Sequence, residues 1–259
     1  MKSVKRYKGI ERDNFMTSIQ ELVDVVARGL PVVDAATSTV TVSRKGDPYL
    51  KGVSTMLEGS FVSELFQWWR QNSSNSLINP ALLNSSLEVP YPGQTRSRCD
   101  AVFLCRSDGM DSTWAVEFKR TQMVGDNGKN NDYGIPKLLS PYLKDRSLRH
   151  DVERLSRSGL APRLGVIGYS FKHSFALIEE SLMRHPDEQE RLKNLRTVCS
   201  NNDPAFGVLD PGEMVFLARQ MLERSGLVLD YAVAEFENAW RHPCGGSGIV
   251  YGWEVRPTG

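Results

Sequence analysis

Cysteine and histidine are scarce in this chain, and neither is spaced as a metal-binding pair. The four cysteines include no CxxC pair, so the spacing typical of a zinc site is absent, and we expect a reduced, cytoplasmic protein. The four histidines lack HxH or HxxxH spacing. The chain also has no GxSxG elbow and no Walker-type phosphate loop, which disfavours phosphoryl chemistry of the ATP-binding kind.

Strong net charge and long apolar runs are missing as well. A formal net charge of +1 argues against a large surface that binds nucleic acid without regard to sequence. A local basic groove is still compatible with this net charge. The basic start, Met1–Arg6, is followed by charged residues, so we expect neither a signal peptide nor a membrane span. A hydrophobic content of 40% over 259 residues indicates one large globular domain, or a core with appendages.

What the chain does have is a pair of strand-like segments that carry acidic residues. Cys99–Phe103 is apolar except for Asp100, and Trp114–Lys119 alternates polar and apolar residues. Residues two apart in a strand point to the same face, so Glu117 and Lys119 lie side by side. The linking segment contains Asp-Gly, a strong turn signal. A hairpin through this turn would bring Asp100 next to Glu117.

Two carboxylates and one lysine on an apolar sheet need partners. Charged groups on a buried sheet must be paired or must bind a metal ion, and hard carboxylate oxygens suit Mg²⁺, with Mn²⁺ as a substitute. A lysine beside them can orient a water molecule and offset the negative charge that builds up on a phosphate. The alternative interpretation of the same pattern is a structural salt bridge across a hairpin.

The segment Arg98–Val102, followed by Glu117-Phe118-Lys119, resembles the PD-(D/E)XK nuclease superfamily, which has the restriction-endonuclease-like fold. Cys99 replaces the proline that this family has before its first acid. The resemblance covers roughly residues 55–170. It implies that Asp100 and Glu117 are metal ligands and that Lys119 positions the attacking water. In this family a glutamate on the first core helix also points at the metal site.

The helix expected over Met56–Arg70 offers two glutamates for that role. Its apolar stripe at helical spacing consists of Phe61, Val62, Leu65 and Trp69. Glu58 falls near the middle of this stripe, and we assign it to the metal site as a ligand and catalytic residue. Glu64, at the edge of the stripe, is the alternative. The remaining interpretation is a solvated glutamate near a helix N-terminus, where the helix dipole favours a negative charge.

The order of the neighbouring elements follows the core of the same family. The first of three strands is expected within Ser86–Tyr91. A helix is expected from His150 to about Gly159, and Leu164–Tyr169 reads as a buried strand that returns parallel to the second hairpin strand. We therefore expect an α/β fold, with a central mixed sheet flanked by helices in α-β-β-β-α-β order.

Three regions follow from this interpretation. Residues 1–54 form an N-terminal extension, residues 55–170 the nuclease core, and residues 171–259 a C-terminal helical region with a final strand, packed as the same domain. Periodicity predicts further helices over Asp13–Gly29, Ser174–Arg184, Asp187–Cys199, Pro211–Gly226 and Leu227–Trp240. Alternation predicts further strands over Thr37–Ser43 and Ile249–Val255.

Substrate contacts are expected just after the second hairpin strand. Arg120 and Gln122 are the candidates, because such groups bind a scissile phosphate or its neighbours, and ordinary surface polarity is the alternative. The segment Met123–Arg149 that follows is rich in glycine and asparagine and carries basic residues. It reads either as a loop that closes over a nucleic-acid backbone or as an insertion without that role.

These observations favour a Mg²⁺-dependent endonuclease that hydrolyses phosphodiester bonds. The resemblance puts DNA ahead of RNA as the substrate, and restriction or genome defence ahead of repair as the role. A homodimer is left open, since many double-strand-cutting enzymes of this fold need one. The alternatives are a catalytically inactive member of the fold that serves as a nucleic-acid-binding or assembly module, and a structural α/β domain in which the acidic hairpin arose by chance.

Overall fold

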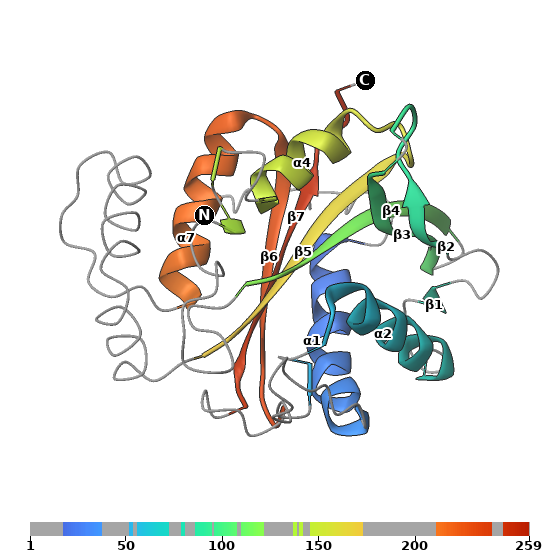
Figure 1. The fold of residues 1–259 in the computed structure, drawn as a ribbon, viewed down its shortest axis with the longest axis vertical. Helices are drawn as coiled ribbons and strands as arrows, with labels where there is room; N and C mark the ends of the chain where they lie inside the picture. The colour runs from blue at the N-terminus through green and yellow to red at the C-terminus, as the bar shows by residue number, and fades with distance from the viewer. Residues whose placement is uncertain are drawn as a thin grey trace, which may run out of the picture.

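A mixed β-sheet organises the part of the chain that the computed structural model describes, which is residues 18–37, 52–53, 56–72, 79–80, 86–94, 96–107, 110–121, 137–138, 140–141, 146–172, 211–239 and 246–258. Within these residues the sheet has seven strands in the order β1-β3-β4-β5-β7-β6, and β2 also pairs with β3 (Figure 1). The strands are β1 (Asn79–Pro80), β2 (Ser86–Pro90), β3 (Arg98–Ser107), β4 (Met110–Arg120), β5 (Arg163–Phe171), β6 (Val228–Phe236) and β7 (Gly248–Val255).

Helices cover both faces of this sheet. Figure 1 shows α1 (Ile19–Ala36) and α2 (Glu58–Asn72) on one side, and α4 (Leu148–Ser156) and α7 (Pro211–Ser225) on the other. The first pair packs on Phe103, Val116 and Phe118, while the second pair packs on Ala115 and Trp253. Because alternate residues of β4 point to opposite faces, this central strand contributes to both hydrophobic cores.

The pairing of β3, β4 and β5 confirms the predicted hairpin and the predicted parallel return. β3 and β4 are antiparallel, with Ala101 opposite Val116 and Phe103 opposite Trp114. β4 and β5 are parallel, and α4 lies in the connection between them, as a parallel pair requires a long crossover. The order α2, β2, β3, β4, α4, β5 is the expected α-β-β-β-α-β order, with the two-residue β1 added before β2.

Helix α1 extends further along the chain than the periodicity predicts. Its N-terminus is closed by a capping box between Ser18 and Glu21, and it continues past Gly29 and through Pro31 to Ala36. Gly29 is the point where α1 crosses α2, because a Cβ atom built there would lie 2.5 Å from the Trp68 ring. Gly29 is therefore a site of close contact within α1 and not the last residue of the helix.

The predicted helix over Leu227–Trp240 is wrong, because residues 228–236 form strand β6. Gly226, at a φ of +69°, ends α7, and the chain then pairs antiparallel with β7. The alanine and glutamate content of this stretch favours a helix, yet Ala232 and Phe236 lie buried on one face of the strand. The described part of the C-terminal region is therefore one helix and two strands that extend the same sheet, not a helical region with a final strand.

Among the described strands, β6 lies at one end of the sheet order, and side chains bind two of its backbone groups. The Tyr231 N–H donates to Asp230 Oδ1 at 2.8 Å, and Gln20 Nε2 donates to the Val233 carbonyl at 3.4 Å. Such contacts compete with pairing to another strand, which is how many proteins protect a sheet edge.

Several expectations fall on residues that the structure does not describe. They are the helices predicted over Ser174–Arg184 and Asp187–Cys199, most of the strand predicted over Thr37–Ser43, and residues 13–17 of the first helix. None of the helices in the described part of the chain has the length and apolar character needed to cross a bilayer.

Candidate active site at the end of strand β4

The hairpin places Asp100 and Glu117 across from each other. The register that pairs Ala101 with Val116 makes Asp100 and Glu117 the next facing residues, on the sheet face covered by α4. Asp100 Oδ2 accepts a hydrogen bond from the Phe118 N–H at 2.6 Å, which fixes the carboxyl group toward β4. The strand alternation that was read from the sequence therefore brings these two acids together.

The contact between the two acids perturbs Asp100 strongly. Burial and the adjacent negative charge of Glu117 raise the pKa of Asp100 to about 9, although the hydrogen bond from Phe118 acts in the opposite direction. Two adjacent carboxylates, one buried and one partly buried, cannot both remain charged without compensation. A shared proton or a nearby positive charge would supply that compensation.

A tyrosine and an arginine also form hydrogen bonds with Glu117. Its side chain is almost fully buried, and its Oε1 accepts from the Tyr91 hydroxyl at 2.5 Å and from Arg154 Nη2 at 2.7 Å. The Arg154 guanidinium also lies over the Tyr91 ring, 4.8 Å from its centroid. Burial and the negative charge of Glu117 raise the pKa of Tyr91, so this hydroxyl keeps its proton at neutral pH.

Lys119 lies two residues further along β4 and contacts two other carboxylates. Its Nζ is 2.8 Å from Asp151 Oδ2 and 3.7 Å from Glu58 Oε1. Burial alone would lower the pKa of Lys119, but the negative charges of Asp151 and Glu58 outweigh burial and raise it. The lysine is therefore a firmly charged ammonium on the same sheet face as Glu117.

Of the two glutamates proposed on α2, Glu58 reaches this cluster. Besides its contact with Lys119, Glu58 Oε2 accepts from the Arg120 N–H at 2.6 Å, which ties the start of α2 to the end of β4. Glu64 is exposed on the same helix. The observed contacts thus favour Glu58 over Glu64 as the helix carboxylate.

Of the two expected substrate contacts, Arg120 has its guanidinium bound away from the carboxylate pair. The Arg120 guanidinium donates to the carbonyl oxygens of Met56, at 3.0 Å, and Val53, at 3.4 Å. These bonds hold it against the segment that precedes α2. Gln122 lies outside the described residues.

Two residues of α4 belong to the cluster and were missed in the sequence. Asp151 is 3% exposed, and its Oδ1 is 2.8 Å from Arg154 Nη2, one turn further along the helix. The signal was present, because Asp151 falls within the apolar stripe formed by Leu148, Val152 and Leu155, as Glu58 does within its own stripe. Tyr91, at the end of β2, also contacts the cluster, and no comparable pattern in the sequence identifies it as a site residue.

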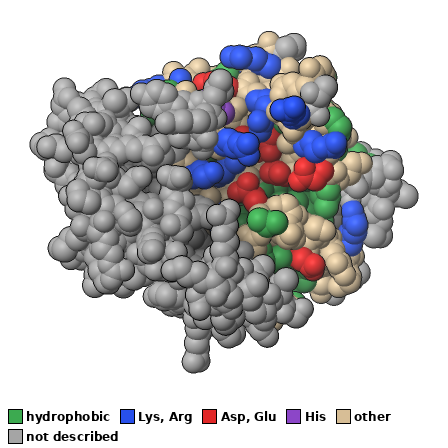
Figure 2. All heavy atoms as spheres, in the orientation of Figure 1, with side chains coloured by type: hydrophobic (Ala, Val, Ile, Leu, Met, Phe, Trp, Pro, Cys, Tyr) green, Lys and Arg blue, Asp and Glu red, His purple; other side chains and the backbone are tan. Residues whose placement is uncertain are grey.

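The surface around these residues combines both signs of charge. Figure 2 shows acidic side chains gathered near the middle of the face viewed, with lysine and arginine side chains beside and above them. Lys137 lies close enough to Lys119 that burial and the positive charge of Lys119 lower its pKa. An anionic polymer could approach the lysine and arginine side chains while a cation is held by the acids.

The donor set fits one Mg²⁺ ion at the Asp100–Glu117 pair. Their carboxylate oxygens are hard ligands, and the raised pKa of Asp100 means that ionising it beside Glu117 calls for a compensating positive charge. Glu58 is directed to Lys119 and Arg120 instead. Across the described residues, no group of three or more His, Cys, Asp or Glu side chains is arranged to hold a metal ion, so water and substrate oxygens would complete the coordination.

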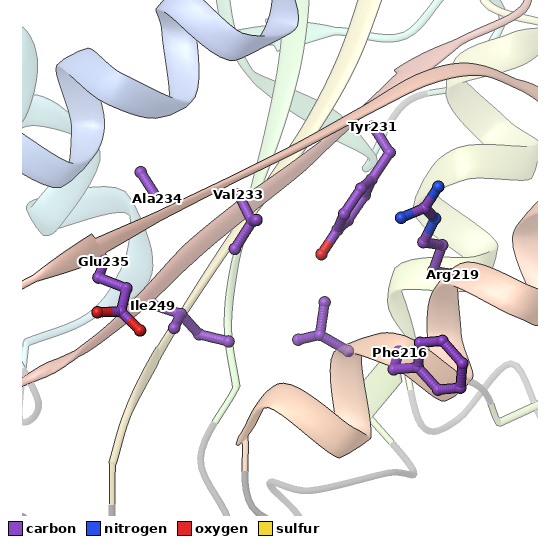
Figure 3. Close-up of a pocket in the computed structure, with 8 residues that line it drawn as sticks. Phe216, Arg219, Tyr231, Val233, Ala234, Glu235 and Ile249 are labelled. Carbon is purple, nitrogen blue, oxygen red and sulfur yellow. The ribbon is translucent and has the colours of Figure 1, made fainter.

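A groove between α7 and β6 is separate from this cluster and shares none of its residues. It has a volume of about 440 Å³ and is lined mainly by apolar side chains, among them Phe216, Val233 and Ile249. Figure 3 shows Arg219 and Tyr231 together at one end, where the guanidinium lies 4.5 Å from the ring centroid. Its lining includes no pair of acids.

No protein-family model, curated protein or solved structure matches this chain. The interpretation of the site therefore depends on the residue pattern and on the contacts described above.

Proposed function

We propose that this chain is a metal-dependent nuclease of the PD-(D/E)XK superfamily that hydrolyses phosphodiester bonds in DNA. The observation that carries the proposal is the contact between Asp100 and Glu117, with Lys119 next along the same face of β4. Acid, acid and lysine thus occupy neighbouring positions on one hairpin, as the resemblance requires. The order of α2, β2, β3, β4, α4 and β5 supports the restriction-endonuclease-like assignment.

Asp100 and Glu117 would hold Mg²⁺ or Mn²⁺, with Glu58 as the carboxylate at the edge of the site. Such an ion, when bound, polarises a phosphate oxygen and makes a bound water more acidic. In the hydrolysis, the attacking water gives up one proton to solvent and its oxygen bonds to phosphorus, the bond from phosphorus to the leaving oxygen breaks, and that oxygen takes up a proton from solvent. The protein's part is to align the water with the phosphate and to stabilise the added negative charge.

Lys119 is suited to both tasks. An ammonium group has three N–H donors, and its ion pairs with Asp151, at 2.8 Å, and Glu58, at 3.7 Å, do not use all of them. A remaining N–H can donate to the attacking water or to a phosphate oxygen. Because its neighbours keep Lys119 charged, it acts as a hydrogen-bond donor and a positive charge, not as a base.

A second candidate is an inactive module of the same fold that binds nucleic acid or assembles with a partner. The observation in its favour is that Arg154 and Tyr91 both donate to Glu117 Oε1, one of the oxygens that a metal ion would need. A purely structural salt-bridge network would have the same contacts. This candidate predicts binding without cleavage.

A cleavage assay separates the two candidates. The purified chain is incubated with plasmid, several long DNAs, single-stranded DNA and RNA, in Mg²⁺, Mn²⁺ or EDTA. Cleavage that needs a divalent metal and is lost in Asp100→Ala and Lys119→Ala supports the nuclease. Lys172→Ala is the matched control, because this half-exposed lysine pairs with Glu235 on a different part of the sheet. Cleavage that survives in both site variants would contradict the assignment.

A further inference from the structure

Helix α4 contributes two charged side chains to the cluster that the proposed chemistry does not use. Asp151 and Arg154 are one turn apart and face the sheet, where they meet Lys119 and Glu117. The contacts form one chain: Lys119 Nζ to Asp151 Oδ2 at 2.8 Å, Asp151 Oδ1 to Arg154 Nη2 at 2.8 Å, and Arg154 Nη2 to Glu117 Oε1 at 2.7 Å.

We propose that Asp151 is the positioning residue for Lys119, and that Arg154 orients the Asp151 carboxylate and connects it to Glu117. This inference rests on the proposed function, since it concerns how the water-positioning lysine is held. Asp151 itself touches neither the attacking water nor the phosphate. It acts by restricting where the Lys119 ammonium lies relative to the acidic pair.

Lys119 needs a positioning contact because a lysine side chain is flexible. A lysine side chain has four rotatable bonds and many accessible rotamers, so Lys119 alone would sample several positions. The contact with Asp151 selects one of them, and Glu58 supports it from the other side at a longer distance. A misplacement of about 1 Å at a reacting centre can cost about 100-fold in rate.

The use of both Asp151 oxygens argues against a merely local salt bridge. Asp151 and Arg154 could satisfy each other within α4, yet one oxygen is directed to β4, and the guanidinium also reaches Glu117. The neighbouring pair Arg149–Glu153 is local, since it joins side chains one turn apart that are each about one-third exposed. Burying Asp151 is costly unless its charge is paired, and an apolar residue would serve stability as well.

The decisive variant is Asp151→Asn, which keeps the shape and one acceptor oxygen but removes the charge. We expect kcat for metal-dependent DNA cleavage to fall about 10- to 100-fold, with KM within about twofold of wild type. Glu153→Gln is the matched control on the same helix and should cleave as wild type does. Melting in EDTA checks that Asp151→Asn is folded under assay conditions.

Two measurements without turnover separate positioning from other roles. Titration with Mn²⁺ should give Asp151→Asn an affinity within about threefold of wild type, since Asp151 is not a ligand, whereas Asp100→Asn should lose binding. Loss of Mn²⁺ binding in Asp151→Asn would assign Asp151 to the metal and overturn the positioning role. In EDTA, Lys119→Met and Asp151→Asn should be non-additive in the free energy of unfolding, and additive effects would overturn the coupling.

Failure of this inference differs from failure of the proposed function. If wild type cleaves no nucleic acid in any metal, the nuclease assignment falls, and this inference falls with it. If wild type cleaves and Asp151→Asn cleaves at the same rate, the nuclease assignment stands and the positioning role alone is overturned.

Discussion

The Asp100 carboxyl group lies against the Glu117 carboxyl group across the β3–β4 hairpin, and burial together with this neighbour raises the pKa of Asp100 to about 9. Natural active sites often keep such like-charge contacts at a cost in stability. The contact therefore makes a prediction about stability that can be checked before any substrate is known.

Asp100→Asn should stabilise the metal-free protein at alkaline pH. The folded pKa of Asp100 lies above its unfolded value, so between about pH 4 and pH 9 the folded state holds a proton that the unfolded state lacks, and stability falls as pH rises. Asparagine avoids this loss and still accepts the hydrogen bond from Phe118. We expect a gain on the order of a few kcal/mol near pH 8, and none near pH 4.

Urea unfolding in EDTA across this pH range measures the effect. Asp24→Asn is the control, because its carboxylate accepts a hydrogen bond from Gln20 at an exposed position. A variant that is less stable than wild type at every pH would show that Asp100 is charged and well compensated in the metal-free protein.

The juxtaposition of Asp100 and Glu117 could be predicted from the sequence, because strand alternation and turn signals depend on neighbouring residues. Alternation in Trp114–Lys119 determines which side chains share a face, and the Asp-Gly signal between the two segments predicts the hairpin pairing that β3 and β4 have. Glu58 was identifiable because a carboxylate in an apolar helical stripe is unusual. The same reasoning applied to Asp151 would have found it.

Other features depend on contacts between distant segments. Asp151 meets Lys119 only because α4 crosses back over β4, and no local pattern specifies that packing. Residues 228–236 were misread as a helix because alanine and glutamate favour helices, whereas pairing with β7 decides the outcome. Helix α1 continues past Gly29 because α2 packs closely there, which no signal in α1 itself reveals.

Glu58→Gln should reduce cleavage, and Glu64→Gln should not. Glu58 contacts the Lys119 ammonium and the Arg120 N–H, whereas Glu64 is exposed on the same helix. Glutamine keeps an acceptor for Arg120 but removes the charge beside Lys119. We expect the rate of metal-dependent cleavage to fall about 10- to 100-fold for Glu58→Gln alone. Equal rates for the two variants would remove Glu58 from the site.

Tyr91→Phe should destabilise the metal-free protein through Glu117. The buried Tyr91 hydroxyl donates to Glu117 Oε1, and losing a hydrogen bond to a charged group costs about 2 kcal/mol. Tyr231→Phe is the control, since its hydroxyl points into the groove of Figure 3. Guanidinium unfolding in EDTA compares the two variants, and a loss below about 0.5 kcal/mol for Tyr91→Phe would mean that Arg154 alone suffices for Glu117.

Gly29→Ala should destabilise the packing of α1 on α2. A Cβ atom at Gly29 would lie 2.5 Å from the Trp68 ring and 2.6 Å from Leu65, so one helix must move. We expect a loss of about 1–3 kcal/mol in the free energy of unfolding, measured by urea titration. At Gly59 on α2, the nearest atom is the flexible end of Glu88 at 3.1 Å, so Gly59→Ala should be neutral or slightly stabilising.

Mn²⁺ should raise the melting temperature of wild type but not of Asp100→Asn. An ion that binds only the folded protein stabilises it by about 2.7 kcal/mol at 100 times its dissociation constant, which corresponds to roughly 5–10 °C for a chain of this size. Differential scanning fluorimetry with increasing Mn²⁺ measures the shift, and Glu64→Gln should follow wild type, because this glutamate is exposed on α2. An inactive module whose Glu117 is satisfied by Arg154 and Tyr91 predicts no shift in any variant. A shift that survives in Asp100→Asn would place the ion elsewhere on the protein and separate metal binding from the hairpin.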